Sequence, residues 1–197
     1  FQSKSKYMSR FIIIDTCVWI VLAKEPNLYD LLETLKTILY QKNFVLVLPK
    51  SVKIEFERHR GQIEADWNNK CKRLISGMKD GRKHFPDYSE DLLKLHNDIQ
   101  NALANPNSHV ENNLKLVDAL FEQAIPMNNC SELMLAEAGR RVFNRTAPAL
   151  NSRSSSVGDC LLWSTVLKSI KKGDVWFCTD NKHDFSQGDR YDLPHED

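Results

Sequence analysis

The sequence predicts a three-layer α/β/α fold around a central, mostly parallel sheet, with a helical insertion. Three short apolar runs alternate with longer stretches whose apolar residues recur at helical spacing. Apolar runs of this length, rich in β-branched residues, are typical of parallel strands buried on both faces. Helices that alternate with such strands favour a parallel sheet covered by helices.

The composition is that of a globular protein. The chain has 197 residues, of which 42% are hydrophobic and 27% charged, enough for one domain with a sizeable core. We expect a single domain over residues 8–197 that includes the insertion at about 62–130. Residues 1–7 resemble the remainder of a cleaved affinity tag, and Met8 is the expected native start.

Cysteine content and charge restrict the setting. The five cysteines are scattered and none are spaced as C-x-x-C, so we expect a reducing, cytoplasmic location and no zinc site. No apolar stretch approaches the ~20 residues of a membrane helix. The net charge is +1, so any affinity for a nucleic acid must come from local patches.

The elements follow from these patterns. Strands are predicted at 11–14, 44–48 and 175–178, the second ended by Pro49. Helices are predicted at 18–22, at 28–40, from 51 into the sixties, at 131–144, and from the N-cap Ser156 to the stop at Gly173.

Residues 62–130 break this alternation, because the segment is polar and is interrupted by glycines and prolines. We expect no strand there. Helices are predicted at about 63–76, 89–103 and 109–124, with enough apolar residues to pack on one another.

Acids stand where the predicted strands end and helices begin. Asp15 directly follows the first strand, where a carboxylate is rarely placed for packing. Glu55 and Asp159 each lie on the apolar face of a predicted helix. Simpler interpretations are that Ser156 and Asp159 form a capping box, and that Glu55 pairs with His59.

Asp180 and Asp184 follow the third predicted strand. Turn chemistry explains either acid taken singly. Because parallel strands present their carboxyl ends at one edge, where ligands bind, we expect all these acids to converge there. Such a cluster is tolerable as anions only with a cation, and oxygen ligands suit Mg²⁺ or Mn²⁺.

These segments resemble the PIN domain family of metal-dependent ribonucleases, which includes the VapC toxins. The matching pieces, in order, are "IIIDTCVWI", "SVKIEFE", "SVGDCLLW" and "FCTDNKHDF". The long separation of Glu55 from Asp159 resembles larger bacterial PIN-like proteins more than compact toxins. A toxin or defence role is therefore left open, as is a homodimer or an inhibitory protein partner.

The resemblance implies a catalytic set of Asp15, Glu55, Asp159 and a fourth acid near the last strand. It leaves open whether Asp180, Asn181 or Asp184 contacts the metal. We expect phosphodiester hydrolysis with Mg²⁺ or Mn²⁺, with Asp15 and Asp159 as the principal ligands. By resemblance, RNA is favoured over DNA. Hydroxyl and amide groups expected to hold the ligand carboxylates are those of Thr16, Thr179 and Asn181.

Basic residues suggest where the nucleic acid binds. No acid lies between Glu137 and Asp159, and this stretch contains Arg140, Arg141, Arg145 and Arg153. We expect them to meet phosphates, although Arg140 and Arg141 also fit an ordinary solvated helix end. Lysines and arginines also gather in the first third of the insertion. We expect a helical cap beside the acidic cleft, with this basic third facing the substrate.

Two other functions compete with a nuclease. A phosphohydrolase of the haloacid dehalogenase type needs a second Asp two positions after the first, where this chain has Cys17. A catalytically silent PIN-like module that binds RNA or protein is the second, but such a module should lack some of the acids. A cleavage assay with and without EDTA separates these classes.

Overall fold

The computed structural model describes residues 9–41, 44–104, 109–149, 157–187 and 190–194. Four strands form one sheet in the order β3-β2-β1-β4, and every neighbouring pair is parallel. The strands are β1 (Ser9–Ile14), β2 (Val45–Pro49), β3 (Ile125–Met127) and β4 (Gly173–Cys178). A separate antiparallel pair follows, β5 (Ser186–Gln187) with β6 (Arg190–Pro194). The predicted α/β fold with a parallel central sheet is confirmed.

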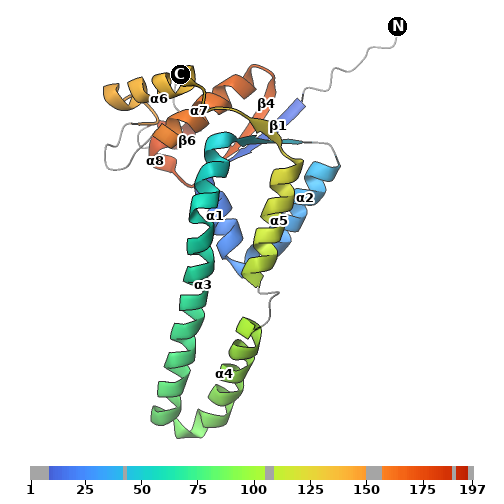
Figure 1. The fold of residues 1–197 in the computed structure, drawn as a ribbon, viewed down its shortest axis with the longest axis vertical. Coiled ribbons are helices and arrows are strands. Elements are labelled where there is room, and N and C mark those ends of the chain that lie inside the picture. The colour runs from blue at the N-terminus through green and yellow to red at the C-terminus, as the bar shows by residue number, and fades with distance from the viewer. Residues whose placement is uncertain (1–8, 42–43, 105–108, 150–156, 188–189, 195–197) are drawn as a thin grey trace.

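Helices cover both faces of the sheet. Their bounds are α1 (Thr16–Lys24), α2 (Tyr29–Tyr40), α3 (Lys50–His84), α4 (Ser89–Ala104), α5 (His109–Gln123), α6 (Glu132–Asn144), α7 (Val157–Ile170) and α8 (Lys182–Phe185). Two 3₁₀ turns, η1 (Pro26–Leu28) and η2 (Pro86–Tyr88), join helices. Figure 1 shows the sheet between α6 and α7 on one side and α1, α2 and α5 on the other.

The main core lies between the sheet and α1, α3 and α5. Ile13 of β1 is fully buried. In the sheet register it lies between Val47 of β2 and Phe177 of β4. The ring of Phe121 on α5 packs edge-on against Trp19 of α1 at 5.0 Å between centroids. Aromatic pairs in this geometry stabilise a core beyond the area that they bury.

β4 is half-exposed, which corrects the expectation of a third buried strand. Its residues alternate between half-buried and exposed, and Trp176 is 58% exposed. The reason is its place at the edge of the sheet, where one face packs on α7 through Trp163 and Phe177. Edge strands covered on one face alternate in burial.

The region 62–130 differs from the prediction in its strand content and in the packing of its last helix. It does contribute a strand, because β3 pairs with β2 at the other edge of the sheet. Helix α5 does not pack within a separate insertion, since its Leu114, Val117 and Leu120 belong to the main core. The limits of the domain and its insertion remain a prediction.

The two helices expected from 51 into the sixties and at 63–76 are one continuous helix, α3. Gly77 and Gly81 do not interrupt it. A Cβ at Gly81 would lie 3.3 Å from the side chain of Leu92, so this glycine lets α4 pack closely on α3. Helix packing therefore outweighs the ~1 kcal/mol that a glycine costs inside a helix.

The paired α3 and α4 form an arm, not the expected cap beside the acids. Figure 1 shows them extending together away from the sheet, with η2 at the far end. Within the residues described, none of the helices is both long and apolar enough to cross a membrane.

Candidate active site at the carboxyl edge of the sheet

Asp15 is held where β1 passes into α1. Its backbone N–H donates to the carbonyl of Cys178 (2.9 Å), which continues the pairing of β1 with β4. Its Oδ2 accepts hydrogen bonds from the Thr179 hydroxyl (2.7 Å) and the Cys17 thiol (3.2 Å). Burial, and then the Asp15 charge, raise the pKa of that thiol to about 11, so it stays protonated as a donor.

Glu55 reaches the same edge from α3, which begins directly after β2. Its Oε2 accepts a 2.9 Å hydrogen bond from the hydroxyl of Thr16. A Cβ added at Gly158 would lie 3.9 Å from that oxygen, so the first turn of α7 approaches Glu55 closely. The Glu55–His59 pair, weighed as the simpler interpretation, is not among the contacts of this carboxylate; its partner is Thr16.

Asp159 lies in the first turn of α7, facing the acids of the other elements. Burial, and then the charges of Asp15, Asp184 and Glu55 in that order, raise its pKa to about 7. Like charges shift a pKa in this way only when they are close. The structure therefore brings four carboxylates, from β1, α3, α7 and α8, toward one point. Ser156, the other half of the possible capping box, lies outside the described residues.

Of the two acids after β4, Asp184 faces the cluster and Asp180 does not. Asp184 is 9% exposed, and its Oδ2 accepts a 2.9 Å hydrogen bond from the Asn181 amide. Asn181 is itself fixed by its N–H, which donates to the Thr179 hydroxyl at 3.0 Å. Asp180 is exposed. Sequence reasoning left this choice open because both acids fit a turn.

The donor set is all oxygen, which suits a hard divalent cation. Among the described residues, no three acidic, histidine or cysteine side chains are already arranged to hold a metal ion. Mg²⁺ commonly binds through one or two carboxylates and keeps several waters, so it does not require such a preformed cage. Burial, and then the like charges of the other three acids, raise the pKa of Asp159, and a bound cation would offset the repulsion among these charges.

Comparison with known proteins places the fold in a family. The family model described as a PIN domain matches residues 12–185. The chain belongs to the PIN domain family. PIN domains are generally nucleases that use divalent metals. No curated protein and no solved structure matches the chain significantly.

The arginines expected to bind phosphate are placed differently. In this PIN domain Arg140 and Arg141 both pair with Glu137 on α6. Arg141 also donates to the carbonyl of Ala147 at 2.7 Å. Arg145, exposed, ends α6 in the left-handed conformation with φ 52°. Arg153 lies outside the described residues. Arg140 and Arg141 therefore contact residues at or near the end of their own helix.

Arg58 is a candidate that sequence reasoning missed. It lines a cavity of about 260 Å³ together with Glu55 and Gly158. The signal in the sequence was its spacing, because Arg58 follows Glu55 by three positions and shares its side of a helix. A cation here is placed to meet the phosphate of a substrate bound at the carboxylates.

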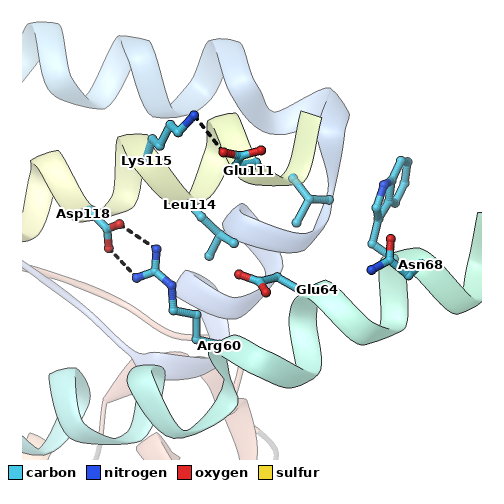
Figure 2. Close-up of a pocket in the computed structure, with 9 residues that line it drawn as sticks. Arg60, Glu64, Asn68, Glu111, Leu114, Lys115 and Asp118 are labelled. Atoms are coloured by element: carbon cyan, nitrogen blue, oxygen red, sulfur yellow. Dashed lines mark hydrogen bonds and ion pairs between the residues drawn. The ribbon is translucent and has the colours of Figure 1, made fainter. Parts of the chain in front are cut away.

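A larger cavity, of about 540 Å³, lies apart from these acids, between α3 and α5. Figure 2 shows Arg60 of α3 directed at Asp118 of α5, with two hydrogen bonds of 2.7 Å each. Glu64 and Glu111 also line this cavity. Its acids and its paired arginine do not favour a phosphate ligand. The contact instead joins the base of the arm to the core.

Proposed function

We propose that this PIN domain is an endoribonuclease that hydrolyses phosphodiester bonds with Mg²⁺ or Mn²⁺. The observation that carries the proposal is the convergence of Asp15, Glu55, Asp159 and Asp184. Burial, and then the charges of the other three acids, raise the pKa of Asp159 to about 7. Carboxylates from four separate elements have no packing purpose at the open edge of a parallel sheet, which is where ligands bind.

Asp15 and Asp159 would hold the metal. Asp15 is the more rigid of the two, because Thr179 and Cys17 both donate to its Oδ2 and leave its Oδ1 for a ligand. When bound, the ion supplies charge neutralisation at the phosphate and lowers the pKa of a coordinated water. Ionised Asp159 is then favoured, since the ion replaces like-charge repulsion with attraction.

Glu55 and Asp184 complete the site from its two sides. The hydroxyl of Thr16 fixes one oxygen of Glu55, so the other can orient a water or accept its proton. The Asn181 amide fixes one oxygen of Asp184 in the same manner. Arg58 binds a phosphate at the mouth of the cavity that it shares with Glu55. Phosphate contacts carry no sequence information, so this arginine does not define a target sequence.

The deciding experiment incubates the protein with unstructured single-stranded RNA and DNA, with Mg²⁺, with Mn²⁺ and with EDTA. We expect cleavage of RNA that both metals support and EDTA abolishes. The Asp15→Asn variant should be inactive while keeping the thermal stability of the wild type. Equal activity of Asp15→Asn, or activity in EDTA, would contradict the proposal. Binding of RNA without cleavage would indicate the catalytically silent module instead.

A further inference from the structure

One face of the long helix α3 carries a continuous acid-free stripe. Steps of seven residues return to nearly the same side of an α-helix. One such row is Arg58, Ala65, Lys72 and Lys79. The row beside it is Gln62, Asn69, Ser76 and Lys83. All eight side chains are exposed, and none is acidic or a large apolar residue.

The acids of α3 lie beside this stripe or on other faces, and several of them have partners. Glu57 pairs with Arg60 at 3.8 Å, and Asp66 pairs with Lys24 at 3.1 Å. At the edges of the stripe, Gln62 donates to Asp66 and Lys83 pairs with Asp80, both as local helix contacts. The stripe therefore keeps a positive surface although the whole chain has a net charge of only +1.

The stripe starts at the candidate active site. Arg58, its first residue, shares a cavity with Glu55 and Gly158. From Arg58 to Lys83 the helix axis rises about 38 Å at ~1.5 Å per residue. A stacked single strand at ~3.4 Å per nucleotide would need about eleven nucleotides to cover this length.

Two uncovered aromatic rings stand at the far end. Phe85, which directly precedes the turn η2 between α3 and α4, is 60% exposed, and Tyr88, the last residue of that turn, is 62% exposed. The turn is well fixed, because Phe85 N–H donates to the Gly81 carbonyl (2.8 Å) and Arg82 donates to the Ser89 hydroxyl (3.3 Å). Exposed rings on a fixed support, beside lysines, are the elements of sequence-tolerant stacking on bases.

We infer that the stripe on α3 is a track for single-stranded RNA, which leads the strand between the carboxylates and the aromatic tip of the arm. The choice of RNA rests on the proposed function; the choice of a single-stranded polyanion rests on the stripe's charge and the uncovered rings. Of the lysines on α3, Lys72, Lys79 and Lys83 lie on the stripe and would bind phosphates, whereas Lys70 lies on another side of the helix.

The test measures binding by fluorescence anisotropy, in EDTA so that no metal-dependent cleavage occurs. The probes are labelled oligouridylates of about 6 and about 24 nucleotides, below and above the length of the track. The stripe variant is Lys72→Gln/Lys79→Gln/Lys83→Gln. Its matched control, Lys70→Gln/Lys94→Gln/Lys171→Gln, removes the same charge from exposed sites off the stripe.

We expect the stripe variant to bind the long RNA about tenfold more weakly, with the salt slope flatter by about two. The affinity for the short RNA should fall far less, and the control variant should bind both RNAs as the wild type does. Phe85→Ala/Tyr88→Ala should also weaken binding of the long RNA by about tenfold. Tyr40→Ala, which removes a ring that is 83% exposed elsewhere, should not.

Equal losses of RNA affinity in the stripe variant and its control would overturn the track. Equal losses of affinity for the short and the long RNA would also overturn it. Tighter binding of the single-stranded DNA of the same length would overturn the choice of RNA. RNA binding by the stripe variant that equals that of the wild type would also overturn the inference, and would favour a protein partner for this face. Because binding is measured without metal, a failure of the cleavage assay alone would reject the proposed function and leave this test intact.

Discussion

The hydroxyl of Thr179 donates a 2.7 Å hydrogen bond to Oδ2 of Asp15, and so joins the end of β4 to the end of β1. The same hydroxyl accepts the N–H of Asn181, whose amide holds Asp184. One side chain thus orients two of the four converging carboxylates.

Thr179→Val should therefore weaken metal affinity by about tenfold, because residues that hold a metal ligand commonly contribute that much. The apparent Mn²⁺ dissociation constant, measured by thermal shift, checks this. The control is Thr37→Val, which removes a hydroxyl bonded only to its own helix, at the carbonyl of Glu33. Similar losses in both variants would show that Thr179 acts through general stability alone.

Asp159→Asn should abolish cleavage yet stabilise the metal-free protein at pH 8. The pKa of Asp159 rises from an ordinary 3.8 to about 7 on folding, so the folded state binds its proton more tightly. Stability from this group is therefore complete below about pH 4 and is lost as the pH rises through about 7. Melting temperatures from pH 4 to 8 should fall less steeply in the variant. A large drop in its melting temperature at every pH would indicate that Asp159 caps α7.

Added Mg²⁺ or Mn²⁺ should raise the melting temperature of the wild type more at pH 8 than at pH 6. A cation that binds only the folded state stabilises it by mass action, and at pH 6 it must first displace the proton of Asp159. Differential scanning calorimetry over a metal titration checks this. The metal-induced shift should be nearly absent in Asp15→Asn, and an unchanged shift there would place the metal elsewhere.

Substitution of the two acids after β4, Asp180 and Asp184, should affect the cleavage rate differently. Asp184→Asn should lower the cleavage rate at least about tenfold, because a buried carboxylate beside Asp159 is lost. Asp180→Asn is the matched control, since Asp180 is exposed and four positions earlier. It should keep wild-type kcat. The opposite ranking would assign the fourth acid to Asp180.

Arg60→Met should lower the free energy of unfolding by about 1 kcal/mol, because a bidentate contact with Asp118 is lost at the base of the arm. Urea denaturation gives this value. Arg140→Met is the control, since its partner Glu137 lies on the same exposed helix, and such pairs contribute little. Equal effects would mean that the Arg60 contact does not fasten α3 to α5.

Much of this arrangement was predictable because apolar runs and the acids that follow them are local signals. The runs around Ile13 and Val47 gave the parallel pair, and its carboxyl edge gave the expected place of Asp15 and Glu55. The choice between Asp180 and Asp184 was not local, since it depends on how α8 turns toward α7.

Other features depended on packing that single segments do not reveal. β3 is three residues long, includes Pro126, and exposes 55% of Ile125, so neither periodicity nor propensity marks it. The continuity of α3 past Gly81 depends on the close approach of Leu92 on α4. Arg58 becomes a candidate only because it lines a cavity together with Gly158, a residue that lies far from it in the sequence.

The contact between Thr179 and Asp15 spans 164 positions of the chain, and it has a consequence for synthesis on the ribosome. β1, α1 and β2 emerge first, because the chain is synthesised from its N-terminus at ~5–20 residues per second. β4, Thr179 and Asp184 are synthesised more than 120 residues after β2, and β4 pairs with β1 on the side opposite β2. The four carboxylates therefore cannot converge until β4 and α8 have left the ribosomal tunnel, and any chemistry that requires all four must wait for the segment that carries Asp184.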